Sequence, residues 1–121
     1  MKKILIAEDS PAMRSLVISA IEALEGYEIV EAANGFEALR LLPREHVDLV
    51  ITDINMPDIN GLELIRYIRN NENYDSIPLI IISTESSEKD LAKGMALGAN
   101  EYLIKPLDPV LLQNLLKKYL G

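Results

Sequence analysis

The chain contains no cysteine among its 121 residues. It therefore has no disulfide, no thiolate nucleophile and no cysteine-based zinc or iron–sulfur site. Long apolar runs are also missing, since the run at 79–82 falls far short of the ~20 residues that a membrane-spanning helix requires. The N-terminus lacks the apolar region and small-residue cleavage site of a secretory signal, so we expect a cytoplasmic protein with no segment inserted in a membrane.

Basic clusters and glycine-rich phosphate loops are absent as well. The chain has 12 basic and 19 acidic residues, a net charge of −7, and no run of lysine or arginine. An acidic surface repels nucleic-acid phosphates, so direct nucleic-acid binding is not expected. No GxGxxG or Walker-type loop indicates a nucleotide site. The single histidine, His46, ends a predicted helix, where a surface residue is a better interpretation than a phosphotransfer site.

The sequence does contain a regular alternation of two patterns. Short runs rich in Ile, Val and Leu are typical of buried strands, and segments with helical spacing of apolar residues separate them. Strands are expected at residues 3–7, 27–32, 49–52, 77–82 and 101–104. Strand–helix–strand units require parallel pairing with right-handed crossovers. The sequence therefore predicts one α/β domain over residues 1–121, a doubly wound five-stranded parallel sheet flanked by five helices.

Capping residues indicate where the helices begin and end. Ser10-Pro11 and Asp108-Pro109 each combine an N-cap residue with a first-turn proline. Ser86 and Ser87 before Glu88 predict the start of a helix that runs to Leu97. Helix ends or starts are also expected at three glycines, Gly26, Gly61 and Gly98.

Acidic residues follow two of the predicted strands. In an open parallel sheet, ligands bind beyond the carboxyl ends of the strands. Glu8 and Asp9 follow the first strand, and Asp53 follows the third. Two like charges 4 Å apart cost roughly 4 kcal/mol at an effective dielectric of 20, so three carboxylates at one edge indicate a compensating cation. Oxygen ligands with several waters suit Mg²⁺, and a backbone carbonyl from the loop after Asp53 could complete them.

Ser83 and Lys105 make this metal site a candidate phosphoryl site. Ser83 follows the fourth strand and Lys105 the fifth. A lysine ammonium can bind one phosphoryl oxygen, while a hydroxyl donates a hydrogen bond to another. Phosphoryl transfer needs mainly positioning and charge neutralisation. A carboxylate, Asp53, could then be the nucleophile and form an aspartyl phosphate.

The pattern as a whole resembles the receiver domain of bacterial response regulators, the phosphoacceptors of two-component signalling. It consists of Glu8-Asp9, Asp53-x-x-Met56-Pro57-x-x-x-Gly61, Ser83-Thr84, Gly98-Ala99 and Lys105-Pro106. The resemblance covers nearly the whole chain and implies a flavodoxin-like fold with strand order 2-1-3-4-5. It also implies that Asp53 is the phosphoacceptor, taking its phosphoryl group from the phosphohistidine of a sensor histidine kinase.

The resemblance further implies that the cofactor is Mg²⁺ and that particular residues bind it. These would be Glu8, Asp9, Asp53 and the backbone carbonyl of Asn55, with Glu8 acting through a water. Glu8 stands where aspartate is commoner in the family, and it keeps the oxygen that the site needs.

Roles for the remaining site residues are likewise implied by the resemblance. Ser83 and Lys105 would hold the phosphoryl oxygens, Ser83 replacing the commoner threonine. Ser83 and Tyr102 would form the switch, in which Tyr102 moves inward when Ser83 shifts. Asn55 and Glu85 lie at positions that tune hydrolysis of the acyl phosphate.

The expected output is a signal passed to another protein. Among receivers, stand-alone chemotaxis regulators are the most similar, and they imply a downstream partner on the surface of the fourth helix, fifth strand and fifth helix. We expect a monomer that catalyses only its own phosphorylation and dephosphorylation and is not otherwise an enzyme. A phosphorelay intermediate and a receiver excised from a larger regulator are alternatives.

Two other classes of function fit the residues less well. A Mg²⁺-dependent phosphatase is a remote alternative, because its general acid would be needed at Asn55, which cannot supply a proton. A flavodoxin-like electron carrier would need a phosphate loop where Glu8 and Asp9 instead repel phosphate.

Overall fold

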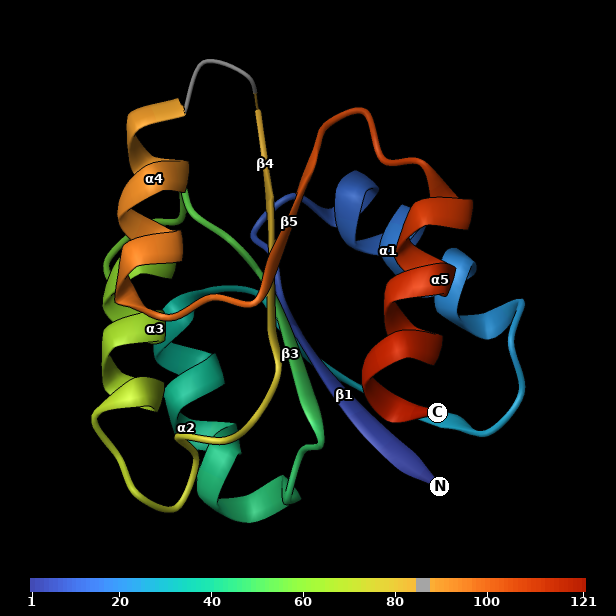
Figure 1. Cartoon of the computed structure of the whole chain (residues 1–121), viewed down its shortest axis with the longest axis horizontal. Coiled ribbons are helices and arrows are strands. Elements are labelled where there is room, and N and C mark those ends of the chain that lie inside the picture. Colours follow the sequence, from blue (N-terminus) through green and yellow to red (C-terminus); the bar gives the residue numbers. More distant parts are fainter. Residues whose placement is uncertain (85–87) are drawn as a thin grey trace.

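The computed structural model describes residues 1–84 and 88–121, and its core is a five-stranded parallel sheet (Figure 1). The strands are β1 (Lys2–Ala7), β2 (Tyr27–Ala32), β3 (Leu49–Asp53), β4 (Leu79–Ser83) and β5 (Glu101–Ile104). Their order is β2-β1-β3-β4-β5, and each pairing is parallel. The predicted fold class and strand order are confirmed.

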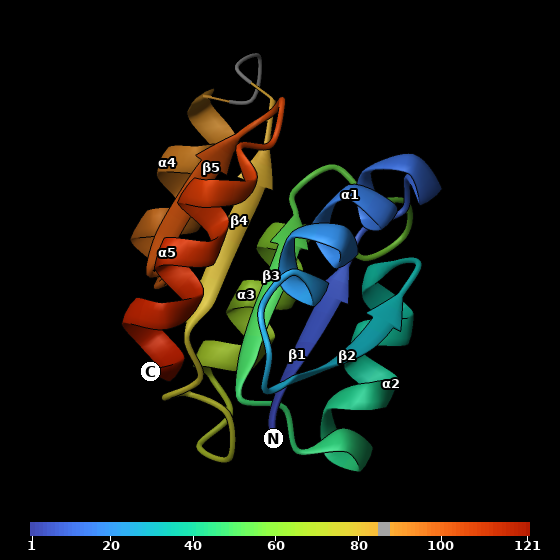
Figure 2. The same ribbon diagram turned by 90° about the vertical axis from the view of Figure 1, so that its right-hand side faces the viewer.

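Helices cover both faces of this sheet. They are α1 (Pro11–Glu22), α2 (Gly35–Glu45), α3 (Gly61–Arg69), α4 (Glu88–Leu97) and α5 (Pro109–Leu120). Figure 2 shows α1 and α5 in front of the sheet and α2, α3 and α4 behind it. None of the described helices is long and apolar enough to cross a membrane.

Alternate strand residues supply two separate apolar clusters, one on each face. Ile4, Ile6 and Ile51 pack with α1 and α5, whereas Leu5 and Val50 pack with α2, α3 and α4. Side chains of successive strand residues point to opposite faces, so a sheet buried on both faces needs a continuous apolar run. This is why the central strands β1, β3 and β4 lack the alternation of apolar and polar residues that half-exposed strands show, whereas the edge strand β2 carries exposed glutamates.

The predicted helix starts agree with the structure wherever residues are described. Ser10 caps α1 by accepting a hydrogen bond from the Met13 N–H at 3.3 Å. Asp108 caps α5 by accepting one from the Val110 N–H at 3.0 Å. The predicted capping serines before α4, Ser86 and Ser87, lie outside the described residues.

Predicted and observed boundaries differ by one residue at β1 and at β3, and by more at β4. Strand β4 begins at Leu79 rather than at residue 77, because Pro78 has no N–H to donate to a neighbouring strand. Gly26 has a φ of +95°, but it lies in the turn before β2, since α1 already ends at Glu22. Gly61 and Gly98 do adjoin helices as predicted.

Candidate functional site

The three predicted acids meet at the carboxyl edge of the sheet. Glu8 follows β1 and is 3% exposed, Asp53 ends β3 and is 6% exposed, and Asp9 is exposed. One carboxylate oxygen from each lies within 4.8 Å of the others. Hard oxygen donors at this spacing suit a divalent cation such as Mg²⁺. The residues present therefore fit the metal that the sequence predicts.

Lys105 enters this cluster from the end of β5. Its Nζ lies 3.2 Å from Glu8 Oε1 and 3.2 Å from Asp53 Oδ2. Its backbone N–H donates to the Ser83 carbonyl at 2.7 Å, so the ends of β4 and β5 are joined next to the acids. The peptide bond between Lys105 and Pro106 is cis. The Lys105 ammonium pairs with two of the three clustered carboxylates, and Asp9 keeps the site negatively charged.

Ser83 brings a hydroxyl to the same edge. The residue is fully buried, and its Oγ has no hydrogen-bond partner among the described residues. Buried side-chain hydroxyls are nearly always hydrogen-bonded, because an unmade bond leaves the cost of desolvation uncompensated. A ligand that presents an oxygen to Ser83 would supply the missing partner.

Burial and charge change the protonation of two of these groups. Burial raises the pKa of Glu8 to about 7, and the charge of Asp53 acts in the same direction. Partial burial works to lower the pKa of Lys105, but the carboxylates of Asp53 and Glu8 outweigh it, so this pKa lies above its ordinary value. Lys105 therefore stays charged at neutral pH, while Glu8 can exchange a proton there.

The backbone around Asp53 is held closely by the start of α3. The Gly61 N–H donates to the Ile54 carbonyl at 2.8 Å. A Cβ atom on Gly61 would lie 2.2 Å from the Asp53 carbonyl oxygen, far too close for non-bonded carbon and oxygen atoms. The Asn55 N–H lies 3.4 Å from Asp53 Oδ1. Glycine at position 61 thus lets helix α3 begin directly against the residue that ends β3.

Arg14 is a site residue that the sequence did not predict. Its Nη1 donates to the Glu8 carbonyl at 2.6 Å, and its Nε donates to Glu31 Oε1 at 3.1 Å. The partners are 6 and 17 residues away in the chain, so no local motif connects them. No spacing in the sequence marks Arg14, because these contacts depend on how α1 packs against β2.

The other predicted residues lie outside the carboxylate cluster. Tyr102, on β5, is 50% exposed and borders a hollow of about 430 Å³ with Glu88, Leu91 and Ile104. Asn55 is exposed beside Asp53. Glu85 lies outside the described residues. As predicted, His46 is an exposed residue at the end of a helix, α2.

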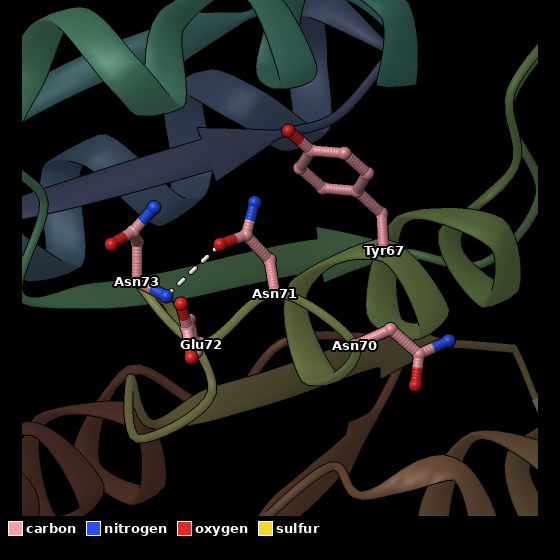
Figure 3. A pocket seen from close by; sticks show the side chains of 5 residues that line it. All are labelled: Tyr67, Asn70, Asn71, Glu72 and Asn73. Carbon is pink, nitrogen blue, oxygen red and sulfur yellow. Dashed lines mark hydrogen bonds between the residues drawn. The ribbon is translucent and has the colours of Figure 1, made fainter.

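A larger hollow lies away from this site, at the far end of α3. It measures about 560 Å³ and is lined by Tyr67, Asn70, Asn71, Glu72 and Asn73 (Figure 3). Asn71 Oδ1 accepts a hydrogen bond from the Asn73 N–H at 2.9 Å, which closes a local turn. The end of α3 lies at the opposite edge of the sheet from Asp53, so size does not identify the functional site here.

Known proteins match this chain in both sequence and structure. The family model of the response regulator receiver domain matches residues 4–117. The chemotaxis protein CheY homolog of Campylobacter jejuni is 36% identical over 98% of this chain and 92% of its own length.

Two solved structures extend the match to the fold. Chemotaxis protein CheY4 of Vibrio cholerae has a TM-score of 0.88 and 34% identity, with 98% of each chain covered. The receiver domain of the sensor histidine kinase PA1611 from Pseudomonas aeruginosa has a TM-score of 0.89 and 29% identity, covering 99% of this chain and 98% of that one. The chain therefore belongs to the response regulator receiver domain family, whose members are Mg²⁺-binding phosphoacceptor switches that interact with histidine kinases and downstream targets.

Proposed function

We propose that this chain is a single-domain response regulator in which Asp53 accepts a phosphoryl group from the phosphohistidine of a sensor histidine kinase. The observation that best supports this is the position of Lys105 Nζ, 3.2 Å from both Asp53 Oδ2 and Glu8 Oε1. A charged donor beside a nearly buried carboxylate, with the Ser83 hydroxyl at the same edge, is an arrangement that suits phosphoryl transfer.

The proposed metal ligands are Glu8, Asp9, Asp53 and the backbone carbonyl of Asn55, with Glu8 acting through a water. When bound, Mg²⁺ would neutralise the carboxylates and the charge on the transferred group. The spacing of the three carboxylates supports this set. So does the Pseudomonas aeruginosa receiver domain, which was solved with a magnesium ion coordinated in its active site cleft.

The proposed reaction exchanges one bond to phosphorus for another. A carboxylate oxygen of Asp53 attacks the phosphorus, a P–O bond forms, and the P–N bond to the imidazole breaks with its electron pair leaving on nitrogen. Lys105 would hold one phosphoryl oxygen, and Ser83 would donate a hydrogen bond to another. Water later attacks the phosphorus, the P–O bond to Asp53 breaks, and inorganic phosphate leaves as the carboxylate is regenerated. Asn55 and Glu85 would tune the rate of this step. The chain would thus catalyse only its own phosphorylation and dephosphorylation.

The proposed output is a change in a protein-binding surface formed by α4, β5 and α5. Tyr102 is half exposed on β5 and borders a hollow together with two residues of α4, Glu88 and Leu91. Movement of Ser83 toward the phosphoryl group would open space for the ring to turn inward. We propose that the chain acts as a cytoplasmic monomer on a chemotaxis-type protein target, without contacting nucleic acid.

Phosphorylation by a small donor tests the central claim. With Mg²⁺ and acetyl phosphate, intact-mass spectrometry should show one added phosphoryl group that is stable to acid and lost in base. D53N should take up none, because an amide is not a nucleophile here. The matched control is D75N, because Asp75 is an exposed loop residue away from the site. This variant should be labelled like the wild type. Labelling that persists in D53N would overturn the assignment.

A further inference from the structure

We propose that Arg14 is the positioning residue of the metal site, holding the peptide that links Glu8 to Asp9, and that Glu31 orients it. This inference rests on the proposed function, because it concerns the affinity of the same site for Mg²⁺. Among the described residues, the ion pair of Arg14 is with Glu31 and not with a carboxylate of the cluster, and its Nη1 donates to the Glu8 main-chain carbonyl at 2.6 Å. It therefore acts through the backbone of a ligand residue.

Both backbone groups of Glu8 are fixed by hydrogen bonds. Its N–H donates to the Ala32 carbonyl at 3.1 Å, and its carbonyl accepts from Arg14. The peptide unit between Glu8 and Asp9 is planar, so holding its carbonyl also fixes the direction in which the chain enters Asp9. Holding this one peptide therefore restricts the positions of two neighbouring carboxylates, those of Glu8 and Asp9. A charged donor to a backbone acceptor makes a stronger bond than a neutral donor would.

Glu31 explains why this cation stays away from the carboxylates. Glu31 Oε1 accepts from Arg14 Nε at 3.1 Å, and Glu31 lies on β2, beyond β1 from the site. The rigid fork of a guanidinium lets one nitrogen bind Glu31 while another points at the Glu8 carbonyl, which a lysine ammonium cannot reproduce. The Glu31 side chain is 54% exposed, so this ion pair adds little stability by itself. The ion pair with Glu31 orients the Arg14 guanidinium and offsets the positive charge of Arg14 near a cation site.

The test is the Mg²⁺ affinity of metal-free protein, measured by NMR titration of the Asp9 amide resonance. R14K keeps the charge but loses the fork, and we expect roughly tenfold weaker Mg²⁺ binding, as for other residues that orient metal ligands. E31Q should weaken binding less, because its amide oxygen can still accept from Arg14. Urea unfolding in EDTA should change little in either variant.

The matched control is E28Q on the same strand. Glu28 pairs with Lys3 at 3.7 Å, and its side chain is also 54% exposed, but it lies near the start of β2. The E28Q substitution removes the same charge as E31Q. If Mg²⁺ affinity is unchanged in E28Q, a loss of affinity in E31Q comes from the changed contact with Arg14 and not from the change in net charge. Wild-type affinity in R14K, or an equal loss in E31Q and E28Q, would overturn this inference alone. A wild-type chain that does not bind Mg²⁺ would overturn the proposed function and the inference with it.

Discussion

Glu8 combines two properties that oppose each other in metal-free protein. It is almost completely buried, and it sits beside Asp53, so its charged form is disfavoured and its pKa rises to about 7. The same residue must be ionised to help hold a divalent cation. Proton and metal therefore compete for one carboxylate close to neutral pH.

This competition predicts a pH dependence of Mg²⁺ binding. Below its pKa, Glu8 must release a proton before it can act as a ligand, so affinity should rise by up to about tenfold per pH unit as pH increases toward 7, and then level off. Calorimetric titration at several pH values measures this directly. E8Q should bind more weakly and show little pH dependence in this window. A wild-type affinity that is flat from pH 6 to pH 8, to within about twofold, would contradict the role given to Glu8.

The same pKa has a consequence for folding stability without metal. The ordinary pKa of the carboxyl is 4.5 and its value here is about 7, so the folded chain binds the proton more tightly than the unfolded chain. Stability is therefore greatest below pH 4.5 for this group and falls as pH rises through about 7. Urea unfolding in EDTA should show that the free energy of unfolding of wild type falls between pH 4.5 and about 7. The E8Q variant should not show this fall.

At the scale of elements, the helix starts are set by single side chains. Asp108 accepts a hydrogen bond from the Val110 N–H at 3.0 Å, and it precedes Pro109 in the first turn of α5. An N-cap side chain satisfies a backbone N–H that the helix itself leaves unpaired. Because α5 contributes the fully buried Leu112 and Leu116 to the core, fraying at its start would loosen one face of the sheet.

Removing this cap should destabilise the protein by a modest amount. We expect D108A to lower the free energy of unfolding by about 1 kcal/mol, measured by urea denaturation at neutral pH. D108N is the matched control, because its side-chain oxygen can still accept the hydrogen bond, and it should remain close to wild type. Equal losses in D108A and D108N would indicate that charge, rather than capping, is responsible.

Most elements could be predicted because their signals are local. The bounds of β2 and β5 agree with the strands predicted at 27–32 and 101–104, and proline after a capping residue indicated the starts of α1 and α5. Strand β4 was less well predicted, because Ile77 is apolar but precedes Pro78. The pattern of apolar residues does not show whether an apolar residue before a proline belongs to the strand or to the loop that precedes it.

The acids and Lys105 could be predicted because parallel strands bring their carboxyl ends to one edge. That argument depends only on topology and on which residue follows each strand. Arg14 could not be found in this way, since its importance depends on which way its side chain turns from the second turn of α1. Its contacts with Glu8 and Glu31 are fixed by packing between α1 and β2, which no spacing in the sequence encodes.

At the scale of the whole molecule, the sheet divides the core into two clusters with no shared buried side chains. Ile21 lies in the cluster with α1 and α5, and Ile65 lies in the cluster with α2, α3 and α4. The strand backbones lie between them. Mutations on opposite faces should therefore act independently, because residues without common contacts rarely couple.

A double-mutant cycle tests this independence. I21V and I65V should each cost about 0.5–1.5 kcal/mol, and the double variant should cost their sum to within about 0.5 kcal/mol, measured by urea unfolding. The comparison pair is I21V with I4V, since Ile4 belongs to the same cluster as Ile21 and some coupling is expected. Coupling across the sheet as large as coupling within one cluster would contradict a divided core.

Residues at the two ends of the sequence lie side by side at the edge of the sheet opposite Asp53. Met1, Lys2, Leu120 and Gly121 line one hollow together with Gly26 and Asp48, and Figure 1 shows the two ends near each other. A short peptide linker between them would close the chain into a ring without approaching the carboxylates. New ends could then be opened in the polar loop at 70–73, at that same edge, giving a circularly permuted switch whose attachment points both face away from its chemistry.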